Sequence, residues 1–141
     1  MRTKIKLLMW LMLITGSTNA WATVYNVGPG EYFGNLTLDD DTLLMTGGYG
    51  GNLVLFGDSL ATIENTDPAK GIAKIFLSSY SILSMSGGNI GDIESWAEGE
   101  INLTGGSVNS LEMYNGSISY LSGGNINSLK MHNASTSYLY G

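Results

Sequence analysis

The sequence predicts an all-β fold: a single-stranded parallel β-helix (β-solenoid) with about 18 residues per coil. Three observations predict it: an 18-residue repeat, aliphatic side chains at fixed positions of that repeat, and Gly or Asn at its corners. The repeats occupy residues 86–103, 104–121 and 122–139 and read SGGNIGDIESWAEGEINL, TGGSVNSLEMYNGSISYL and SGGNINSLKMHNASTSYL. A unit this short cannot bury its own apolar face, so its copies must stack on one another.

Four rows of side chains are predicted to point inward. We number the repeat from the Ser or Thr that precedes the glycine pair. Aliphatic residues recur at positions five, eight and eighteen, and position ten shares the alternation of position eight. Positions nine and eleven then point to solvent. The inward rows are Ile90, Val108 and Ile126; Ile93, Leu111 and Leu129; Ser95, Met113 and Met131; and Leu103, Leu121 and Leu139.

Turn-forming residues mark two corners in each repeat. The glycine pair at positions two and three permits backbone with positive φ, where side chains clash. The second corner is Asn-Gly-Ser at 115–117 and Asn-Ala-Ser at 133–135, and Asn tolerates left-handed backbone. The first repeat has Ala-Glu-Gly at 97–99, so a different shape is expected there.

The same register continues upstream. A block that opens at Thr46 places Leu53 and Ile63 on inward rows, and residues 68–85 continue it without a glycine pair. Residues 64–67 between these blocks are predicted to be a four-residue loop insertion.

The chain thus divides into three parts. Residues 1–22 are a predicted signal peptide, residues 23–45 an N-terminal cap or first irregular coil, and residues 46–141 solenoid repeats, about six coils in all. Within the second part, residues 34–38 echo residues 51–55 with the register shortened by one.

The solenoid is predicted to be right-handed. A left-handed helix built on hexapeptides is the alternative with the same coil length, but it needs equivalent aliphatic positions every six residues. Rows five, eight, ten and eighteen do not fall on that lattice. Parallel crossover connections are also usually right-handed.

The signal peptide is predicted from a basic start, an apolar run at 7–14 and the small-x-small site Ala20-Trp21-Ala22, with cleavage after Ala22. The run is shorter than the roughly 20 residues that span a bilayer, so no membrane span is expected in the mature chain. We expect a secreted protein, extracellular or at the cell surface. The chain has no Cys and therefore no disulfide.

Removal of the signal leaves three Lys against 12 acidic residues, a formal net charge of −9. Such a surface repels nucleic acid and anionic membranes, so no nucleic-acid partner is expected. Catalytic β-helices that cleave acidic polysaccharides combine neighbouring carboxylates with an Arg or Lys, often with a calcium ion. The mature chain has no Arg. No catalytic residue, cofactor or resident metal is therefore predicted.

Carboxylates gather in the first repeat at Asp92, Glu94, Glu98 and Glu100, and Glu112 lies one coil beyond Glu94. The favoured interpretation is a solvated acidic face. The alternative is a weak Ca²⁺ site, because hard cations need several oxygen ligands.

Two outward rows are aromatic and are the candidate ligand-contact residues. They are Phe56, Trp96, Tyr114 and His132 at position eleven and Tyr120 and Tyr138 at position seventeen. Stacked rings in neighbouring coils stabilise one another, and this is the favoured role. The alternative is contact with an extracellular glycan or a partner protein. His132 has no companion Cys or nucleophile, so a place in the ladder is favoured over catalysis or metal binding.

The string SGGNINSL at 122–129, followed by Asn-Ala-Ser at 133–135, resembles repeats of the type SGGSVGSL…DNST in secreted bacterial β-helix proteins. Many of those carry a C-terminal PEP-CTERM sorting signal, whereas this chain has no Pro-Glu-Pro motif, terminal apolar helix or basic tail. The resemblance covers residues 46–141. It implies an exported protein associated with the cell surface or matrix.

The last residues, 138–141 (YLYG), match residues 120–123 (YLSG), where one repeat ends and the next begins. A solenoid end without a cap exposes strand edges and apolar core. Two hypotheses follow: the chain is a fragment or early-terminated product of a longer repeat protein, or the open coil mediates self-association. The predicted function is a secreted, non-enzymatic β-solenoid that acts as a surface or extracellular structural or adhesive module. The alternative is a carbohydrate-binding solenoid or a remnant of a polysaccharide-active β-helix enzyme.

Overall fold

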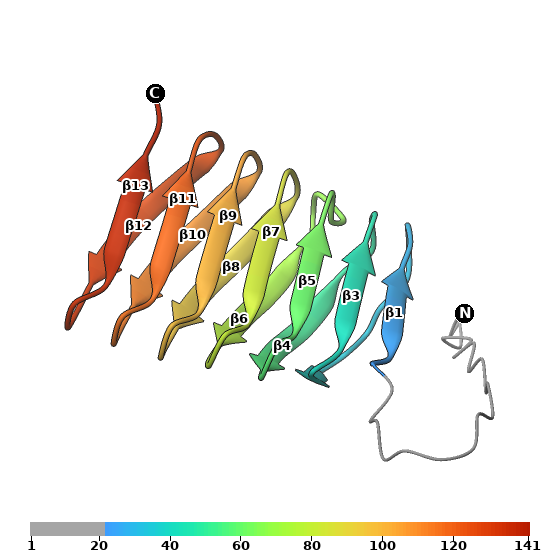
Figure 1. Ribbon diagram of the computed structural model, residues 1–141. Coiled ribbons are helices and arrows are strands. Elements are labelled where there is room, and N and C mark those ends of the chain that lie inside the picture. Colours follow the sequence, from blue (N-terminus) through green and yellow to red (C-terminus); the bar gives the residue numbers. More distant parts are fainter. Residues whose placement is uncertain (1–21) are drawn as a thin grey trace, which may run out of the picture.

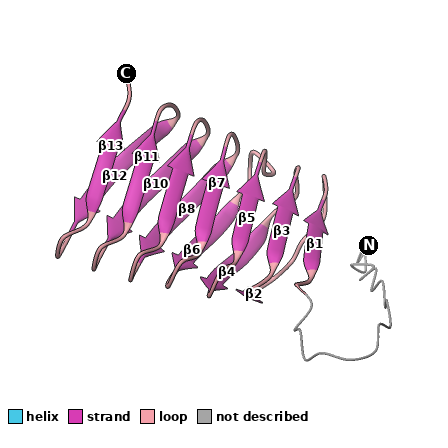
Figure 2. Ribbon diagram, viewed as in Figure 1, coloured by secondary structure: helices cyan, strands magenta, loops and turns pink. Residues whose placement is uncertain are grey.

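The computed structural model describes residues 22–141, so the predicted signal peptide lies outside the described residues except for Ala22. Within this part of the chain there are 13 β-strands and no helix. The strands form two parallel sheets, one of seven strands and one of six. The sheets face each other across the core, and short loops join the strand ends of one sheet to those of the other (Figure 2).

The odd-numbered strands form the seven-stranded sheet: β1 (Val24–Val27), β3 (Thr42–Met45), β5 (Leu60–Ile63), β7 (Ile82–Met85), β9 (Glu100–Leu103), β11 (Ile118–Leu121) and β13 (Thr136–Leu139). The even-numbered strands form the six-stranded sheet: β2 (Leu36–Asp39), β4 (Gly50–Phe56), β6 (Ile72–Leu77), β8 (Asn89–Ser95), β10 (Ser107–Met113) and β12 (Asn125–Met131). Each coil therefore contributes one strand to each sheet, which confirms the predicted β-solenoid of about six turns.

The strand register confirms the alignment of the repeats. Val108 pairs with Ile126 and Leu121 with Leu139, at a separation of one 18-residue repeat. β4 pairs with β6 through Leu53 and Ile75, which lie 22 residues apart, as the four-residue insertion at 64–67 requires. β2 pairs with β4 at a separation of 17 residues, as the shortened upstream register predicts.

The coils wind to the right. In Figure 1 the chain advances from right to left, the seven-stranded sheet runs upward nearest the viewer, and the six-stranded sheet runs downward behind it. This sequence of movements describes a right-handed turn, the usual hand for parallel crossovers.

The core consists of side chains that point between the two sheets. The predicted inward rows are buried in all but the last coil, as Ile93, Leu111 and Met113 show. In the last coil the residues of the same rows are more exposed. Full burial of one such aliphatic side chain contributes about 1.5–3 kcal/mol. A fifth inward row, at position sixteen, includes Leu83 and Ile101 and was not predicted. It has the same alternation as position eighteen, two residues further on.

The second corner has the same backbone in all three repeats, so the different shape expected at 97–99 is wrong. Ala97 and Glu98 have φ of 45° and 68°, and Asn115 and Gly116 have φ of 49° and 80°. Left-handed backbone costs a non-Gly residue roughly 1–2 kcal/mol. The stacking of each corner on its neighbours thus outweighs the local preference of these residues.

The two ends of the solenoid differ. Residues 23–45, expected to be a cap or irregular coil, contain β1, β2 and the strand β3, and they pair in register with the coils that follow. In the last coil the inward-facing Met131 and Leu139 are 44% and 73% exposed. Apolar core rows and two open strand edges, those of β12 and β13, therefore meet at this end.

Candidate functional site

The row at position eleven lies at the corner that follows each strand of the six-stranded sheet. The backbone ladder continues through this row: the amide of Trp96 donates to Leu77, that of Tyr114 to Ser95 and that of His132 to Met113, each at 2.8 Å. Since every coil is held in this way, the side chains of the row are placed one above another along the solenoid axis.

Three of the four rings predicted for this row form a stack. The ring centroids of Trp96 and Tyr114 are 4.0 Å apart with an interplanar angle of 11°, and those of Tyr114 and His132 are 4.5 Å apart at 6°. Phe56 does not belong to the stack, which corrects the prediction. The intervening coil has Ser78 at this position, so Phe56 and Trp96 are separated by a coil without a ring.

The stack leaves few ring faces open. Both faces of Tyr114 are covered, one by Trp96 and the other by His132. Trp96 is covered by Tyr114 on one side only and is 39% exposed. A ligand that stacks on aromatic faces can therefore use Trp96 but not Tyr114.

Polar contacts hold the stack in place. The Tyr114 hydroxyl donates to Glu112 Oε2 at 2.6 Å, and Lys130 Nζ forms an ion pair with Glu112 Oε1. Hydrogen bonds from Lys130 and from Tyr114 lower the pKa of the Glu112 carboxyl. The same carboxylate raises the pKa of Lys130 and of Tyr114. The ion pair joins the coil of β10 to the coil of β12, whereas the Tyr114 hydrogen bond lies within the coil of β10.

The acidic face is also engaged in contacts between coils. Lys74 on β6 pairs with Glu94 on β8 at 2.5 Å, and its Nζ lies 4.4 Å from the centroid of Phe76. Within residues 22–141, no group of three or more His, Asp or Glu side chains is placed to hold a metal ion. The alternative Ca²⁺ site therefore has no ligand cluster among these residues.

Tyr80 is a surface residue that the sequence reasoning missed. It is 66% exposed, and a hydrogen bond to the Glu98 carboxylate is the main cause that raises its pKa. Asp58, Tyr80 and Glu98 share position thirteen in successive coils, so the repeat alignment contained the signal for this contact.

The second aromatic pair lies on the seven-stranded sheet. Tyr120 and Tyr138 stack with ring centroids 5.2 Å apart and an interplanar angle of 9°. The row continues past Tyr120 with smaller polar side chains, Asn102 and then Ser84.

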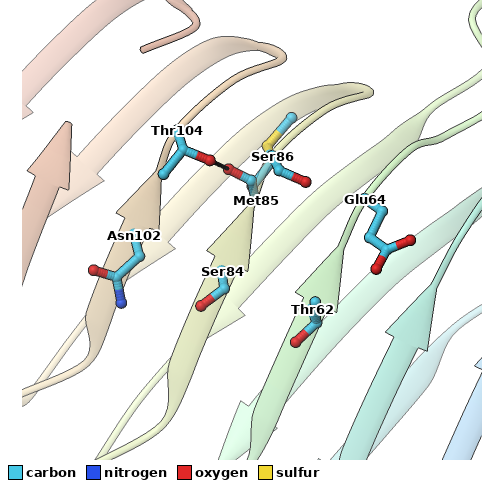
Figure 3. A pocket seen from close by; sticks show the side chains of 7 residues that line it. All are labelled: Thr62, Glu64, Ser84, Met85, Ser86, Asn102 and Thr104. Atoms are coloured by element: carbon cyan, nitrogen blue, oxygen red, sulfur yellow. Dashed lines mark hydrogen bonds between the residues drawn. The ribbon is translucent and has the colours of Figure 1, made fainter. Parts of the chain in front are cut away.

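A shallow pocket opens over these smaller side chains. It is lined by Thr62, Glu64, Ser84, Met85, Ser86, Asn102 and Thr104. Figure 3 shows that Thr62, Ser84 and Asn102 stand on three adjacent strands, with Glu64, Ser86 and Thr104 beyond the strand ends. The Thr104 hydroxyl is already bonded to the Met85 carbonyl at 3.3 Å. Five of these seven residues carry a hydroxyl or amide group, but most of the surface they expose in the pocket is apolar.

The fold and the two surfaces define a parallel β-solenoid whose outward rows are ladders of stacked rings and paired charges. Comparisons of the chain with protein-family models, with curated proteins and with solved structures find no match. In residues 22–141 no helix is long and apolar enough to cross a membrane.

Proposed function

We propose that this protein is an exported, non-enzymatic β-solenoid that serves as a structural or adhesive module at the cell surface or in the extracellular matrix. The observation that carries the proposal is the use of its outward side chains. Rings stack on rings, Glu112 pairs with Lys130, and the amides of Asn127 and Asn133 reach the equivalent Asn109 and Asn115 of the coil before. Such contacts connect neighbouring coils, as a scaffold requires.

Export is tested by the N-terminal sequence of the exported protein. N-terminal sequencing of the protein recovered from outside the producing cell is expected to begin at Thr23, after cleavage behind Ala22. Recovery of the uncleaved chain from the cell interior would contradict the proposal.

The adhesive role rests on the last coil. Its exposed Met131 and Leu139 and the open edges of β12 and β13 fit a second copy of the chain, because a strand edge pairs with another strand edge. Sedimentation velocity is expected to show concentration-dependent association of the wild type. Leu139→Lys is expected to abolish it, whereas Val24→Lys, at an exposed residue of the opposite end, leaves it intact. A monomer at every concentration would exclude self-association.

The second candidate function is carbohydrate binding, alone or as a remnant of a polysaccharide-active enzyme. The open face of Trp96 favours it, because exposed aromatic rings are common at recognition surfaces. A screen for depolymerisation of acidic polysaccharides separates an enzyme from a binding module. Product formation that scales with protein concentration would overturn the non-enzymatic proposal.

A further inference from the structure

One coil interrupts the aromatic row at position eleven. The Ser78 amide donates to Leu55 at 3.0 Å, and the Trp96 amide donates to Leu77 at 2.8 Å. Ser78 therefore occupies the level between Phe56 and Trp96, and it is the small side chain of this row between two large ones. We refer to the level of Ser78, between these two rings, as the vacant rung.

The residues around the vacant rung are exposed or half-buried. Phe56 on one side is 44% exposed, and Trp96 on the other presents the face that Tyr114 does not cover. Phe76 precedes Ser78 by two residues on the outward side of β6, and Tyr80 follows it by two at the corner. Aromatic residues thus flank Ser78 in the two neighbouring coils and in its own coil.

We propose that the vacant rung binds one pyranose ring of a neutral glycan, which takes the place of the missing aromatic ring. The proposal deepens the carbohydrate-binding function and rests on it. Strands in a sheet are about 4.8 Å apart, so Phe56 and Trp96 lie on levels about 9.6 Å apart. Non-bonded carbon atoms approach to about 3.5–4.0 Å, so a flat ring between them needs only about 7–8 Å. A puckered sugar ring is thicker and fits the remaining space better.

The charges nearby select against acidic sugars. Glu98 and, more weakly, Asp58 raise the pKa of the Tyr80 hydroxyl, so both carboxylates lie near it, and Glu94 on the neighbouring strand is paired with Lys74. A uronate would face these carboxylates, whereas the hydroxyl groups of a neutral sugar can bond to them. The Tyr80 and Ser78 hydroxyls supply further donors and acceptors at the rim.

Trp96 provides a direct readout of binding. Trp10 and Trp21 lie in the predicted signal peptide, so the emission of a chain that begins at Thr23 comes from Trp96 alone, and a Trp96→Phe variant measures any contribution of an uncleaved signal. We expect soluble cellohexaose, laminarihexaose or chitohexaose to change the Trp96 emission of the full chain saturably. Hexagalacturonate is the acidic probe and is expected to give no change. Indole is the flat-ring probe, followed by calorimetry because its own fluorescence overlaps that of Trp96, and it is expected to bind more weakly than the neutral glycans.

The decisive variant fills the vacant rung. Ser78→Tyr adds a ring that stacks between Phe56 and Trp96, so we expect the melting temperature to rise by roughly 2–6 °C and the glycan affinity to fall at least about tenfold. A gain in stability shows that loss of binding is not a folding defect. Ser78→Ala keeps the space open and is the matched control. Trp96→Ala is expected to abolish glycan binding measured by calorimetry, and Tyr140→Ala, at an exposed ring outside both aromatic rows, to leave it unchanged.

The possible outcomes distinguish failure of the vacant-rung site from failure of the carbohydrate-binding function. Glycan binding that survives both Ser78→Tyr and Trp96→Ala would overturn the vacant-rung site and leave a carbohydrate-binding protein with another site. No binding of any neutral probe by the wild type would overturn both. Saturable binding of indole alone, blocked by Ser78→Tyr, would overturn the assignment to a sugar.

Discussion

Ser95 occupies an inward position that holds Met113 and Met131 in the two following coils. It is fully buried, and its hydroxyl has no hydrogen-bond partner. In the same coil Gly99 replaces the serine found at position fourteen of neighbouring coils, and a Cβ there would lie 2.6 Å from Ser95 Oγ. The two replacements are thus coupled, and the coil loses one corner hydroxyl while it buries another hydroxyl unpaired.

Ser95→Ala is expected to stabilise the protein by about 1 kcal/mol, because an unpaired buried hydroxyl costs about 1–3 kcal/mol. Ser117→Ala is the matched control. Its hydroxyl donates to the Ser95 carbonyl and accepts from the Tyr114 amide, so its loss is expected to destabilise by about 1 kcal/mol. Urea unfolding of the two variants measures both changes, and destabilisation by Ser95→Ala would contradict the assignment.

Glu112 predicts a pH dependence at the C-terminal coils. Its pKa is lowered from an ordinary value of 4.5 by Lys130 and Tyr114, so its contribution to stability is present above that value. The contribution is lost as the pH falls through the lower folded value. The melting temperature of the wild type is therefore expected to exceed that of Glu112→Gln at pH 7, and the difference to vanish on acidification below pH 4.5. A difference that persists at pH 2 would show that the carboxylate charge is not responsible.

At the scale of the element, the corners separate glycines that are required from those that are replaceable. Gly106 has φ of 86°, and a Cβ there would lie 2.4 Å from Met85 Cε and 2.8 Å from the Gly88 carbonyl oxygen. Gly116 has φ of 80°, but the nearest atom to a Cβ would be Glu98 Cγ at 3.9 Å. The equivalent residue of the next coil is Ala134, with φ of 60°.

Gly106→Ala is expected to destabilise the fold by more than about 2 kcal/mol, because the strain of left-handed backbone adds to a steric clash. Gly116→Ala meets no clash and is expected to cost about 1 kcal/mol. Thermal unfolding of both variants gives the comparison. Equal losses would show that backbone conformation, rather than contact with the neighbouring coil, determines the need for glycine.

Much of the element structure was predictable because the repeat constrains it. The inward rows, the insertion at 64–67 and the shortened register before β4 follow from alternation and alignment. The prediction for the corner at 97–99 was wrong because pairing with the adjacent coils overrides the local backbone preference of Ala97 and Glu98. Position sixteen was missed because Ala61 and Ser119 interrupt its aliphatic pattern, although both are buried.

The candidate site was predictable only in part. The register alone shows that Ser78 interrupts the row between Phe56 and Trp96. The open face of Trp96 requires the ring orientations, which follow from the packing of Tyr114 and not from spacing. The bond between Tyr114 and Glu112 likewise depends on side-chain direction.

At the scale of the whole molecule, each coil contacts only its neighbours, so stability is close to a sum along one dimension. The last coil has a neighbour on one side only, and its apolar residues are partly exposed. Its backbone amides that point to the open edge lack a strand partner.

Hydrogen exchange is expected to reveal a gradient. Amides of β12 and β13 exchange faster than those of β8, β9, β10 and β11, because local opening at the end exposes less buried surface. Mass spectrometry of proteolytic fragments from dilute protein measures this order. Protection of β13 that rises with protein concentration would report association through the open coil, and uniform protection in dilute protein would contradict the gradient.

The loop at 64–67 adds four residues to one coil, and the strands on both sides keep their pairing and their inward faces. The adjoining residues 68–70 are exposed. This corner is therefore a natural attachment point for a foreign peptide. An epitope or affinity tag inserted near Ala69 would be displayed on the outside of the solenoid, at the corner between β5 and β6, and neither sheet would need to rearrange.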